Sequence, residues 1–312
     1  MDEPLRTVTR TSGVNAALKD GHVAPEGFRF AFEEVPVLVQ AFRRMVRGLE
    51  YDVCEMALTT YLVAREHGVR FTALPLPLVR GFHHGAVQVL AGSDVRTPAD
   101  LAGRRVGVNR GYTVTTGVWA RAVLAGEHGL DLGAVTWVLS GDEHVQAYTP
   151  PANVVPAPEG AALGDLLRSG DLAAVVGADL EGEDVVPLLP DPEGAALAAL
   201  RERGLWPVNH VVVVRDALLT ERPELAAQVF DVFARAKQPY LARLRAGKEH
   251  TAADRTYRQV LDVTGADPLP YGLEPNRAVL GQLLETAVEQ RILRGPVRLD
   301  DVFAAGTRGL TG

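Results

Sequence analysis

Short apolar runs alternate with helical patterns along most of the chain. Between the runs, segments such as 36–48 and 114–129 repeat their apolar residues at helical spacing, and Gly129 is the predicted stop of the second helix. Strands that alternate with helices are typical of an α/β protein with mostly parallel sheets. The predicted strands lie at residues 6–10, 28–33, 51–54, 71–78, 86–91, 105–109, 135–139, 172–176 and 208–214.

The pattern changes after Arg215. Residues 223–246, 252–263 and 275–293 are nearly all helical in spacing, and no further strand of comparable quality follows. This C-terminal segment could pack on the preceding sheet or form the face of a homodimer, and its pattern leaves both open. A proline-rich stretch, T-P-P-A-N-V-V-P-A-P-E-G at 149–160, predicts a surface loop without regular structure.

Length and composition indicate an ordinary globular protein. The 312 residues are 47% hydrophobic and 23% charged, which is enough chain for two lobes. Because no flexible linker divides them, we expect two lobes joined by short strand crossovers, with a cleft at the hinge. The single cysteine, Cys54, excludes an internal disulfide and a cysteine-based zinc cluster.

Charge and hydropathy narrow the range of partners. A net charge of −7 leaves no basic surplus for nucleic acid, so we expect none as a partner, and an anionic small molecule would need a local positive pocket. No run approaches the roughly 18 apolar residues of a membrane span, and the charged residues 1–10 lack the apolar core of a secretory signal. We therefore expect a cytoplasmic protein without a membrane partner, unless a leader has been removed.

A helix start after the strand at 105–109 is a candidate carboxylate cradle. The segment Gly111-Tyr112-Thr113-Val114-Thr115-Thr116 places free backbone N–H groups and hydroxyls at a positive helix end. The alternative is that Thr113 merely caps the helix. The segment is not a phosphate loop of the Walker type, because it lacks G-K-[ST].

Titratable residues follow two predicted strands and enter a third. Arg80, His83 and His84 come after an apolar strand and combine a permanent cation with two imidazoles, of which only one should enter the cleft because neighbouring side chains point opposite ways. Glu55 directly follows the strand 51–54, which would place its carboxylate at the cleft edge. His210 enters a run of four valines. Each could instead be structural: Glu55 a surface or capping residue, and the histidines satisfied core residues.

Six blocks of sequence together resemble a known family, the 4,5-dihydroxyphthalate decarboxylases, whose fold is similar to that of type II periplasmic binding proteins. The resemblance implies that lobe one is built from residues 1–85 and 207–312, and that lobe two, 86–206, is inserted between them. Ligands of such folds lie in the interlobe cleft. The blocks are D-V-C-E-M-A-L-T-T-Y at 52–61, R-G-F-H-H-G-A-V at 80–87, D-L-A-G-R-R-V-G-V at 100–108, T-T-G-V-W-A-R at 115–121, W-P-V-N-H-V-V-V-V-R at 206–215 and D-P-L-P-Y-G-L-E-P-N-R at 267–277.

The resemblance implies roles for the candidate residues. The expected catalytic residues are Glu55, His84 and His210, and the expected substrate contacts are Arg80, His83, Tyr112, Thr115, Thr116, Trp119 and Asn209. Asp142, Glu143 and His144 are expected in the wall of lobe two. His83 and Gly85 depart from the family pattern, in which an arginine precedes the second histidine and a serine follows it. The missing cation puts phthalate-type dicarboxylates in question as substrates.

The function expected from this resemblance is non-oxidative decarboxylation of a hydroxylated aromatic or cyclic carboxylate, without an organic cofactor. Glu55, His84 and His210 could form a two-histidine, one-carboxylate metal site, but no H-x-H or H-E-x-x-H spacing supports it, and we expect no metal. The alternatives are an ABC-type solute-binding protein for an aromatic or sulfonated acid, and a menaquinone-pathway or specialised-metabolite enzyme of the same superfamily.

Overall fold

The computed structural model describes residues 3–312, which divide into two compact units. Unit 1 contains the described residues up to Gly81 together with Val208–Gln282 and Val297–Gly312, and unit 2 contains Phe82–Pro207 and Leu283–Pro296. The sequence placed all residues after 206 in lobe one, but Leu283–Pro296 belongs to unit 2. The reason is a buried hydrogen-bond pair, in which Arg121 donates to Gln290 and Gln290 donates to the carbonyl of Val118.

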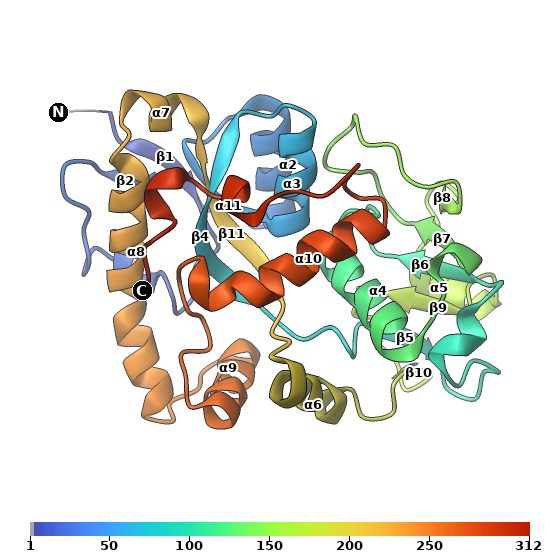
Figure 1. Cartoon of the computed structure of the whole chain (residues 1–312). Helices are drawn as coiled ribbons and strands as arrows, with labels where there is room; N and C mark the ends of the chain where they lie inside the picture. The colour runs from blue at the N-terminus through green and yellow to red at the C-terminus, as the bar shows by residue number, and fades with distance from the viewer. Residues whose placement is uncertain (1–2) are drawn as a thin grey trace. The chain divides into compact units, whose positions relative to one another are not determined.

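Unit 1 is built on a five-stranded sheet in the order β2-β1-β3-β11-β4 (Figure 1). Strand β1 is parallel to β2 and β3, whereas β11 runs antiparallel to both β3 and β4. The central strand β3 and most of β4 are buried, which fits their near-continuous apolar sequences. The strands are β1 (Leu5–Val8), β2 (Phe30–Phe32), β3 (Val53–Ala57), β4 (Phe71–Arg80) and β11 (Val208–Arg215).

The helices of unit 1 cover this sheet, with α8 on one side of it and α2 and α3 on the other in Figure 1. The predicted helical C-terminal segment is confirmed as α8, α9 and α10, and α8 packs on β4 and α1. No helix among residues 3–312 is long and apolar enough to cross a membrane. The helices are α1 (Ala16–Lys19), α2 (Leu38–Gly48), α3 (Leu58–Glu66), α7 (Asp216–Glu221), α8 (Leu225–Arg245), α9 (Ala252–Thr264), α10 (Arg277–Glu289, whose last residues belong to unit 2) and α11 (Leu299–Val302), with short 3₁₀ turns η3 (Glu274–Asn276) and η4 (Ala305–Thr307).

Unit 2 is built on a six-stranded sheet in the order β10-β5-β9-β6-β7-β8. The pairs β6–β7, β6–β9 and β7–β8 are parallel, and β5 is antiparallel to β9 and β10. Five of the nine strand pairings in the two sheets are therefore parallel, as the sequence predicts. The strands are β5 (Val87–Leu90), β6 (Arg105–Val108), β7 (Thr136–Leu139), β8 (Val154–Pro156), β9 (Ala174–Val176) and β10 (Val185–Pro187).

The sequence analysis did not predict two edge strands of unit 2, β8 and β10. The prediction of an irregular loop at 149–160 is wrong, because Val154–Pro156 pairs with β7. The prolines do not prevent this, since β8 lies at the sheet edge and its proline is the last strand residue, where no ladder donor is needed. The other missed strand, β10, also lies at an edge and also ends in proline.

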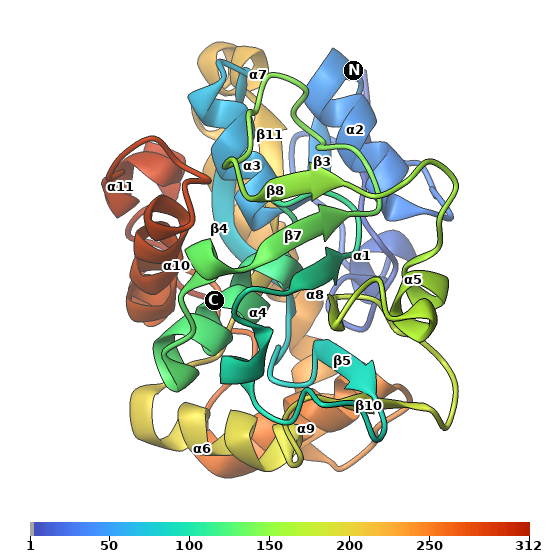
Figure 2. The same ribbon diagram turned by 90° about the vertical axis from the view of Figure 1, so that its right-hand side faces the viewer.

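Helices α4 and α5 cover opposite faces of the sheet of unit 2 (Figure 2). The side chains of α5 pack with Val138 and Val175, while α4 approaches Val108 and Trp137 on the other face. Gly129 ends α4 in the left-handed conformation, with φ of 67°, as predicted. The helical elements are α4 (Thr115–His128), α5 (Leu163–Ser169), α6 (Pro192–Arg203), η1 (Pro98–Leu101) and η2 (Leu132–Ala134).

Candidate functional site

Glu55 and His210 form a buried dyad in unit 1. The sequence placed Glu55 after a strand, but β3 continues to Ala57, and Glu55 lies in its middle. His210 lies opposite Ala57 on the antiparallel strand β11, and Val212 lies opposite Glu55. Side chains alternate along a strand, so Glu55 and His210 point to the same face as diagonal neighbours.

The dyad has the geometry of a carboxylate that orients an imidazole. Oε1 of Glu55 lies 2.6 Å from Nδ1 of His210, and Oε2 accepts a hydrogen bond of 2.8 Å from the backbone N–H of Arg10. The Glu55 side chain is 1% exposed, whereas that of His210 is 18% exposed and meets the ring of Phe42 edge to face. Since Nδ1 faces the carboxylate, Nε2 is the ring nitrogen left for a reacting molecule.

Arg80 is the second charged group at this end of unit 1. It is the last residue of β4 and is buried, and its Nη1 donates to Oδ1 of Asn276 over 2.9 Å. The Asn276 amide in turn donates to the carbonyls of Pro270 and Gly272, both at 2.8 Å. Burial lowers the pKa of the Arg80 guanidinium, although a guanidinium remains charged at neutral pH.

Asn276 and Tyr257 therefore support Arg80, and sequence reasoning assigned a role to neither. The hydroxyl of Tyr257 lies 3.3 Å from the backbone N–H of Arg80 and 3.4 Å from its carbonyl oxygen. The sequence did contain a signal for Asn276, because this residue lies within the block D-P-L-P-Y-G-L-E-P-N-R at 267–277, which is one of the six that carry the family resemblance. Asn209, the neighbour of His210 in β11, is also buried.

His84 belongs to unit 2, where it is fully enclosed. Its Nε2 lies 3.1 Å from Oε1 of Glu127, which also accepts a hydrogen bond of 2.6 Å from Arg203. Its Nδ1 is buried and has no hydrogen-bond partner among the described residues. Burial opposes ionisation of Glu127, but the hydrogen bonds and charges of His84 and Arg203 outweigh it and lower the pKa of this carboxyl group. The neighbouring His83 is buried as well.

Part of segment 111–116, which the sequence predicts as a cradle for a substrate carboxylate, binds a side chain of the protein instead, and whether the segment also binds a substrate stays a prediction. Strands β6 and β7 are parallel and end at paired residues, so the loops after them meet at one edge of the sheet. Glu143, from the loop after β7, accepts hydrogen bonds from the backbone N–H groups of Tyr112 and Thr113 and from the Thr113 hydroxyl, the last at 2.5 Å. Burial raises the pKa of Glu143, against the lowering effect of these hydrogen bonds and of Arg121.

The other predicted contacts in unit 2 are mostly packed inside it. Trp119 is 1% exposed, and Thr115, the first residue of α4, is buried too. The buried ring of Tyr112 lies 3.8 Å from the guanidinium carbon of Arg121, in cation–π geometry. Thr116 is partly exposed and lies close to Gly177. Whether any of these side chains meets a substrate stays a prediction.

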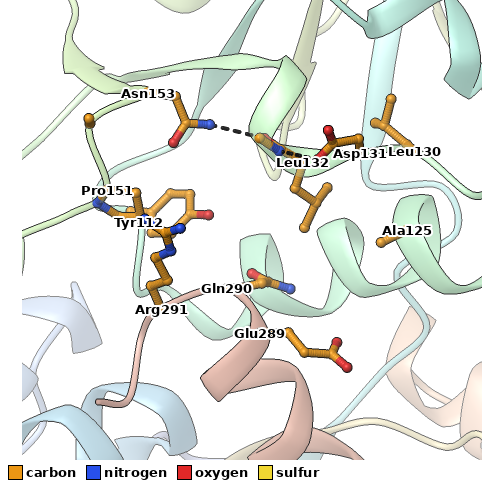
Figure 3. A pocket seen from close by; sticks show the side chains of 12 residues that line it. Tyr112, Ala125, Leu130, Asp131, Leu132, Pro151, Asn153, Glu289, Gln290 and Arg291 are labelled. Atoms are coloured by element: carbon orange, nitrogen blue, oxygen red, sulfur yellow. Dashed lines mark hydrogen bonds between the residues drawn. The ribbon is translucent and has the colours of Figure 1, made fainter. Parts of the chain in front are cut away.

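Unit 2 also contains a cavity of about 510 Å³ (Figure 3). Tyr112 is its only predicted site residue, and the dyad residues do not line it. Asn153 closes one side by donating to the carbonyls of Leu132 and Val135. The lining residues are Tyr112, Ala125, Leu130, Asp131, Leu132, Gly133, Pro151, Ala152, Asn153, Glu289, Gln290 and Arg291.

Neither a thiol nucleophile nor a metal cluster is evident in the part of the chain that the structure describes. Cys54 is fully buried, and burial raises the pKa of its thiol, which is the opposite of what a reactive cysteine needs. Residues 3–312 contain no group of three or more His, Cys, Asp or Glu side chains placed to share a metal ion.

Similarity to solved structures identifies the fold. The chain matches the periplasmic aliphatic sulphonate-binding protein of Escherichia coli with a TM-score of 0.56 at 13% identity, over 99% of this chain and 100% of that one. It matches a Candida albicans gene product with the generic periplasmic binding protein fold with a TM-score of 0.57 at 13% identity, over 99% of both chains. The desulfurization enzyme DSZB matches with a TM-score of 0.56 at 18% identity, over 97% of this chain and 96% of that one. The predicted periplasmic-binding-protein-like fold is confirmed.

Similarity in sequence identifies the family. The chain is 30% identical over 267 residues to a 4,5-dihydroxyphthalate decarboxylase of Comamonas testosteroni, covering 78% of this chain and 79% of that protein. It is 35% identical over 171 residues to the protein of the same name from Pseudomonas putida, covering 50% of this chain and 66% of that protein. No protein-family model matches the sequence. The chain belongs to the 4,5-dihydroxyphthalate decarboxylase family, and the prediction that it is an enzyme is confirmed.

Proposed function

We propose that this protein is a non-oxidative decarboxylase of a hydroxylated aromatic or cyclic carboxylate, with His210 as the proton donor and Glu55 as its positioning residue. The observation that carries the proposal is the dyad, with 2.6 Å between Nδ1 of His210 and Oε1 of Glu55. A buried carboxylate beside Nδ1 fixes the orientation of the ring and stabilises the imidazolium form, which is the form that can donate a proton.

His210 is a better donor than the other two candidates because of its exposure. The side chain of His84 is fully buried and its Nε2 faces Glu127, while that of Glu55 is 1% exposed and accepts two hydrogen bonds. The side chain of His210 is 18% exposed, more than that of either other candidate, so His210 is the residue that we propose to meet the substrate. Glu55 then acts through His210 rather than on the substrate.

The reaction needs only a proton and an electron sink that the substrate itself supplies. Nε2 of His210 gives its proton to the ring carbon that bears the carboxylate, while a hydroxyl in the ortho or para position donates electrons into the ring. The bond between this carbon and the carboxylate then breaks, its electron pair restores the aromatic ring, and carbon dioxide leaves. Water returns a proton to His210, so no organic cofactor or metal is required in the proposal.

Arg80 is the proposed partner of the substrate carboxylate. Asn276 holds one guanidinium nitrogen, and Tyr257 contacts the Arg80 backbone, so the charge is held in a defined place. A guanidinium in a dry site orients a carboxylate strongly, and removal of water from the carboxylate favours loss of carbon dioxide. His83, Asn209, Thr115 and Thr116 remain proposed contacts to the substrate.

The test is direct turnover. The purified protein is incubated with 4,5-dihydroxyphthalate and a panel of hydroxybenzoates, with and without a chelator, and substrate loss and carbon dioxide release are followed. We expect release that the chelator does not change and that His210→Gln lowers by about 100-fold or more, the usual range for a general acid. Release that the chelator abolishes would contradict the cofactor-free mechanism, and no release from any of these acids would contradict the proposed function.

A solute-binding protein is not favoured as an alternative. The sulphonate-binding protein of Escherichia coli shares the fold at 13% identity, whereas the relative at 30% identity is named a decarboxylase. Binding of an aromatic acid without turnover, seen as saturable thermal stabilisation, would restore this alternative. An enzyme of the same superfamily in menaquinone or specialised metabolism would instead release no carbon dioxide from the panel.

A further inference from the structure

The segment just after β1, residues 9–12, contacts the dyad of unit 1 through one backbone group. The N–H of Arg10 donates to Oε2 of Glu55 over 2.8 Å, while Oε1 of the same carboxylate lies 2.6 Å from Nδ1 of His210. Among residues 3–312, this N–H is the only hydrogen-bond donor to Oε2. A buried carboxylate oxygen without a donor is costly, so the place of this N–H governs where the Glu55 carboxylate lies.

The backbone on both sides of this N–H is fixed by Asn15. Nδ2 of Asn15 donates to the carbonyl of Arg10 over 2.8 Å and to Oγ1 of Thr9 over 3.1 Å. Oδ1 of Asn15 accepts a hydrogen bond of 2.9 Å from the backbone N–H of Ser12. Asn15 is buried, so one enclosed amide group determines the course of the whole segment.

Asn15 does not play the role that its place in the chain favours. It is the N-cap residue of α1, a position at which an asparagine side chain normally accepts a hydrogen bond from the first helical N–H groups. Here its side chain makes no such cap. The polar atoms of Asn15 therefore bind segment 9–12 and leave α1 uncapped.

Lys19, also in α1, is a second anchor of this segment. Its Nζ donates to the carbonyl of Thr9 over 2.6 Å and to Oγ1 of Thr11 over 2.9 Å, and it lies 2.6 Å from Oε1 of Glu34. Two side chains from one short helix thus bind the segment, although neither makes a hydrogen bond to the dyad residues.

We propose that Asn15 is a positioning residue for the reaction: it fixes segment 9–12 so that the Arg10 N–H holds the Glu55 carboxylate where this carboxylate orients His210. The inference rests on the proposed function for its statement that the dyad delivers a proton. The positioning itself can be measured without turnover. Because Asn15 acts through the dyad and not on the substrate, its loss should lower kcat and leave KM nearly unchanged.

The first test observes the proton between His210 and Glu55 by NMR, on the full chain with isotope-labelled histidine. A short, charge-assisted hydrogen bond shifts the resonance of its proton downfield. The wild type should give such a resonance, and its loss in His210→Gln assigns it. In Asn15→Ala the resonance should move upfield or disappear through exchange with water, because the carboxylate is no longer held in place.

Two further variants separate positioning from the stability of a helix start. Asn15→Ser supplies a good N-cap for α1, but its side chain is too short to make all three hydrogen bonds to segment 9–12, so the resonance should change as in Asn15→Ala. Thr251→Ala is the matched control, since Thr251 is the N-cap residue of α9 and its Oγ1 accepts a hydrogen bond from the N–H of Asp254. It should lower the melting temperature and leave the resonance unchanged.

Melting temperatures show that the variants compared are folded. An unchanged resonance in folded Asn15→Ala or Asn15→Ser overturns the proposal. A wild type without the resonance also overturns it, because the dyad that Asn15 is proposed to position would then be absent.

The second test measures turnover of 4,5-dihydroxyphthalate and the hydroxybenzoate panel. Asn15→Ala should lower kcat by about 10- to 100-fold and change KM by less than about 3-fold, while Thr251→Ala should leave kcat unchanged. In the His210→Gln background, Asn15→Ala should cause no further loss, because it acts through the dyad.

The two tests distinguish failure of this inference from failure of the proposed function. If the wild type decarboxylates none of these acids but the resonance changes in Asn15→Ala, the proposed function fails and the positioning role stands. If the wild type turns over and Asn15→Ala keeps its kcat, or only raises KM, the positioning role fails alone.

Discussion

The substitution Glu55→Gln tests the role of the carboxylate in the dyad, because it removes the charge and keeps the size of the side chain. The amide can still accept the hydrogen bond from the Arg10 backbone, which spans 2.8 Å in the wild type. Its NH₂ group then faces Nδ1 of His210, where the carboxylate stood at 2.6 Å. An NH₂ group requires Nδ1 to act as an acceptor, so the ring is held in its neutral form, and the imidazolium that donates the proton is no longer stabilised.

The size of the effect follows from the bond that is lost. A hydrogen bond to a charged group contributes about 1.5–3 kcal/mol, and Glu55 is buried, so solvent does not replace it. Because each 1.36 kcal/mol is tenfold in rate, we expect kcat to fall by roughly 10- to 150-fold. KM should change by less than about 3-fold, since Glu55 touches His210 and not the substrate.

The assay is steady-state carbon dioxide release on the best substrate of the hydroxybenzoate panel, with two matched variants. Glu50→Gln removes an exposed carboxylate that pairs with Arg44 and should leave kcat unchanged. His210→Gln should lower kcat at least as far as Glu55→Gln, and the double variant should be no slower than His210→Gln because the two residues act as a unit. A rise in KM at constant kcat for Glu55→Gln, or additive losses in the double variant, would refute the reasoning.

Three further predictions concern residues outside the dyad. His84→Gln keeps a donor toward Glu127, so turnover should stay within about 5-fold of the wild type; a loss as large as that of His210→Gln would make His84 the donor. Gly13→Ala places a Cβ atom 2.2 Å from the ring of Tyr240, whose hydroxyl bonds Asp254, and should lower the free energy of unfolding in urea by about 1–3 kcal/mol; an unchanged value would mean that the ring moves freely. Burial opposes ionisation of Asp254, but hydrogen bonds from His250, Tyr240 and Arg243 outweigh it and lower the pKa of this carboxyl group to about 2. The ionised form therefore stabilises the fold above the unfolded pKa near 4, and this stabilisation is lost as the pH falls from about 4 to 2. Asp254→Asn should lower the free energy of unfolding by roughly 1–2 kcal/mol at pH 7, and a loss that does not shrink toward pH 2 would contradict this linkage.

The dyad was predictable as two separate residues but not as a pair. The apolar run V-C-E-M-A contains a single charge, and a charge usually ends a buried strand, so the sequence placed Glu55 beyond the strand. The strand tolerates Glu55 because His210 and the Arg10 backbone satisfy both carboxylate oxygens. Those partners come from β11 and from the segment just after β1, and no local pattern identifies a partner 155 residues away.

The predicted cradle at 111–116 also shows that local sequence does not identify a partner that is distant along the chain. Its backbone donors, Tyr112 and Thr113, lie in the segment where the sequence predicts a cradle for a substrate carboxylate, but the carboxylate that they bind in the structure is that of Glu143. Which carboxylate is bound depends on the parallel pairing of β6 with β7, because this pairing brings the loop with Glu143 to the same edge. Strand β8 was missed for a related reason, since only its pairing with β7 distinguishes it from a proline-rich loop.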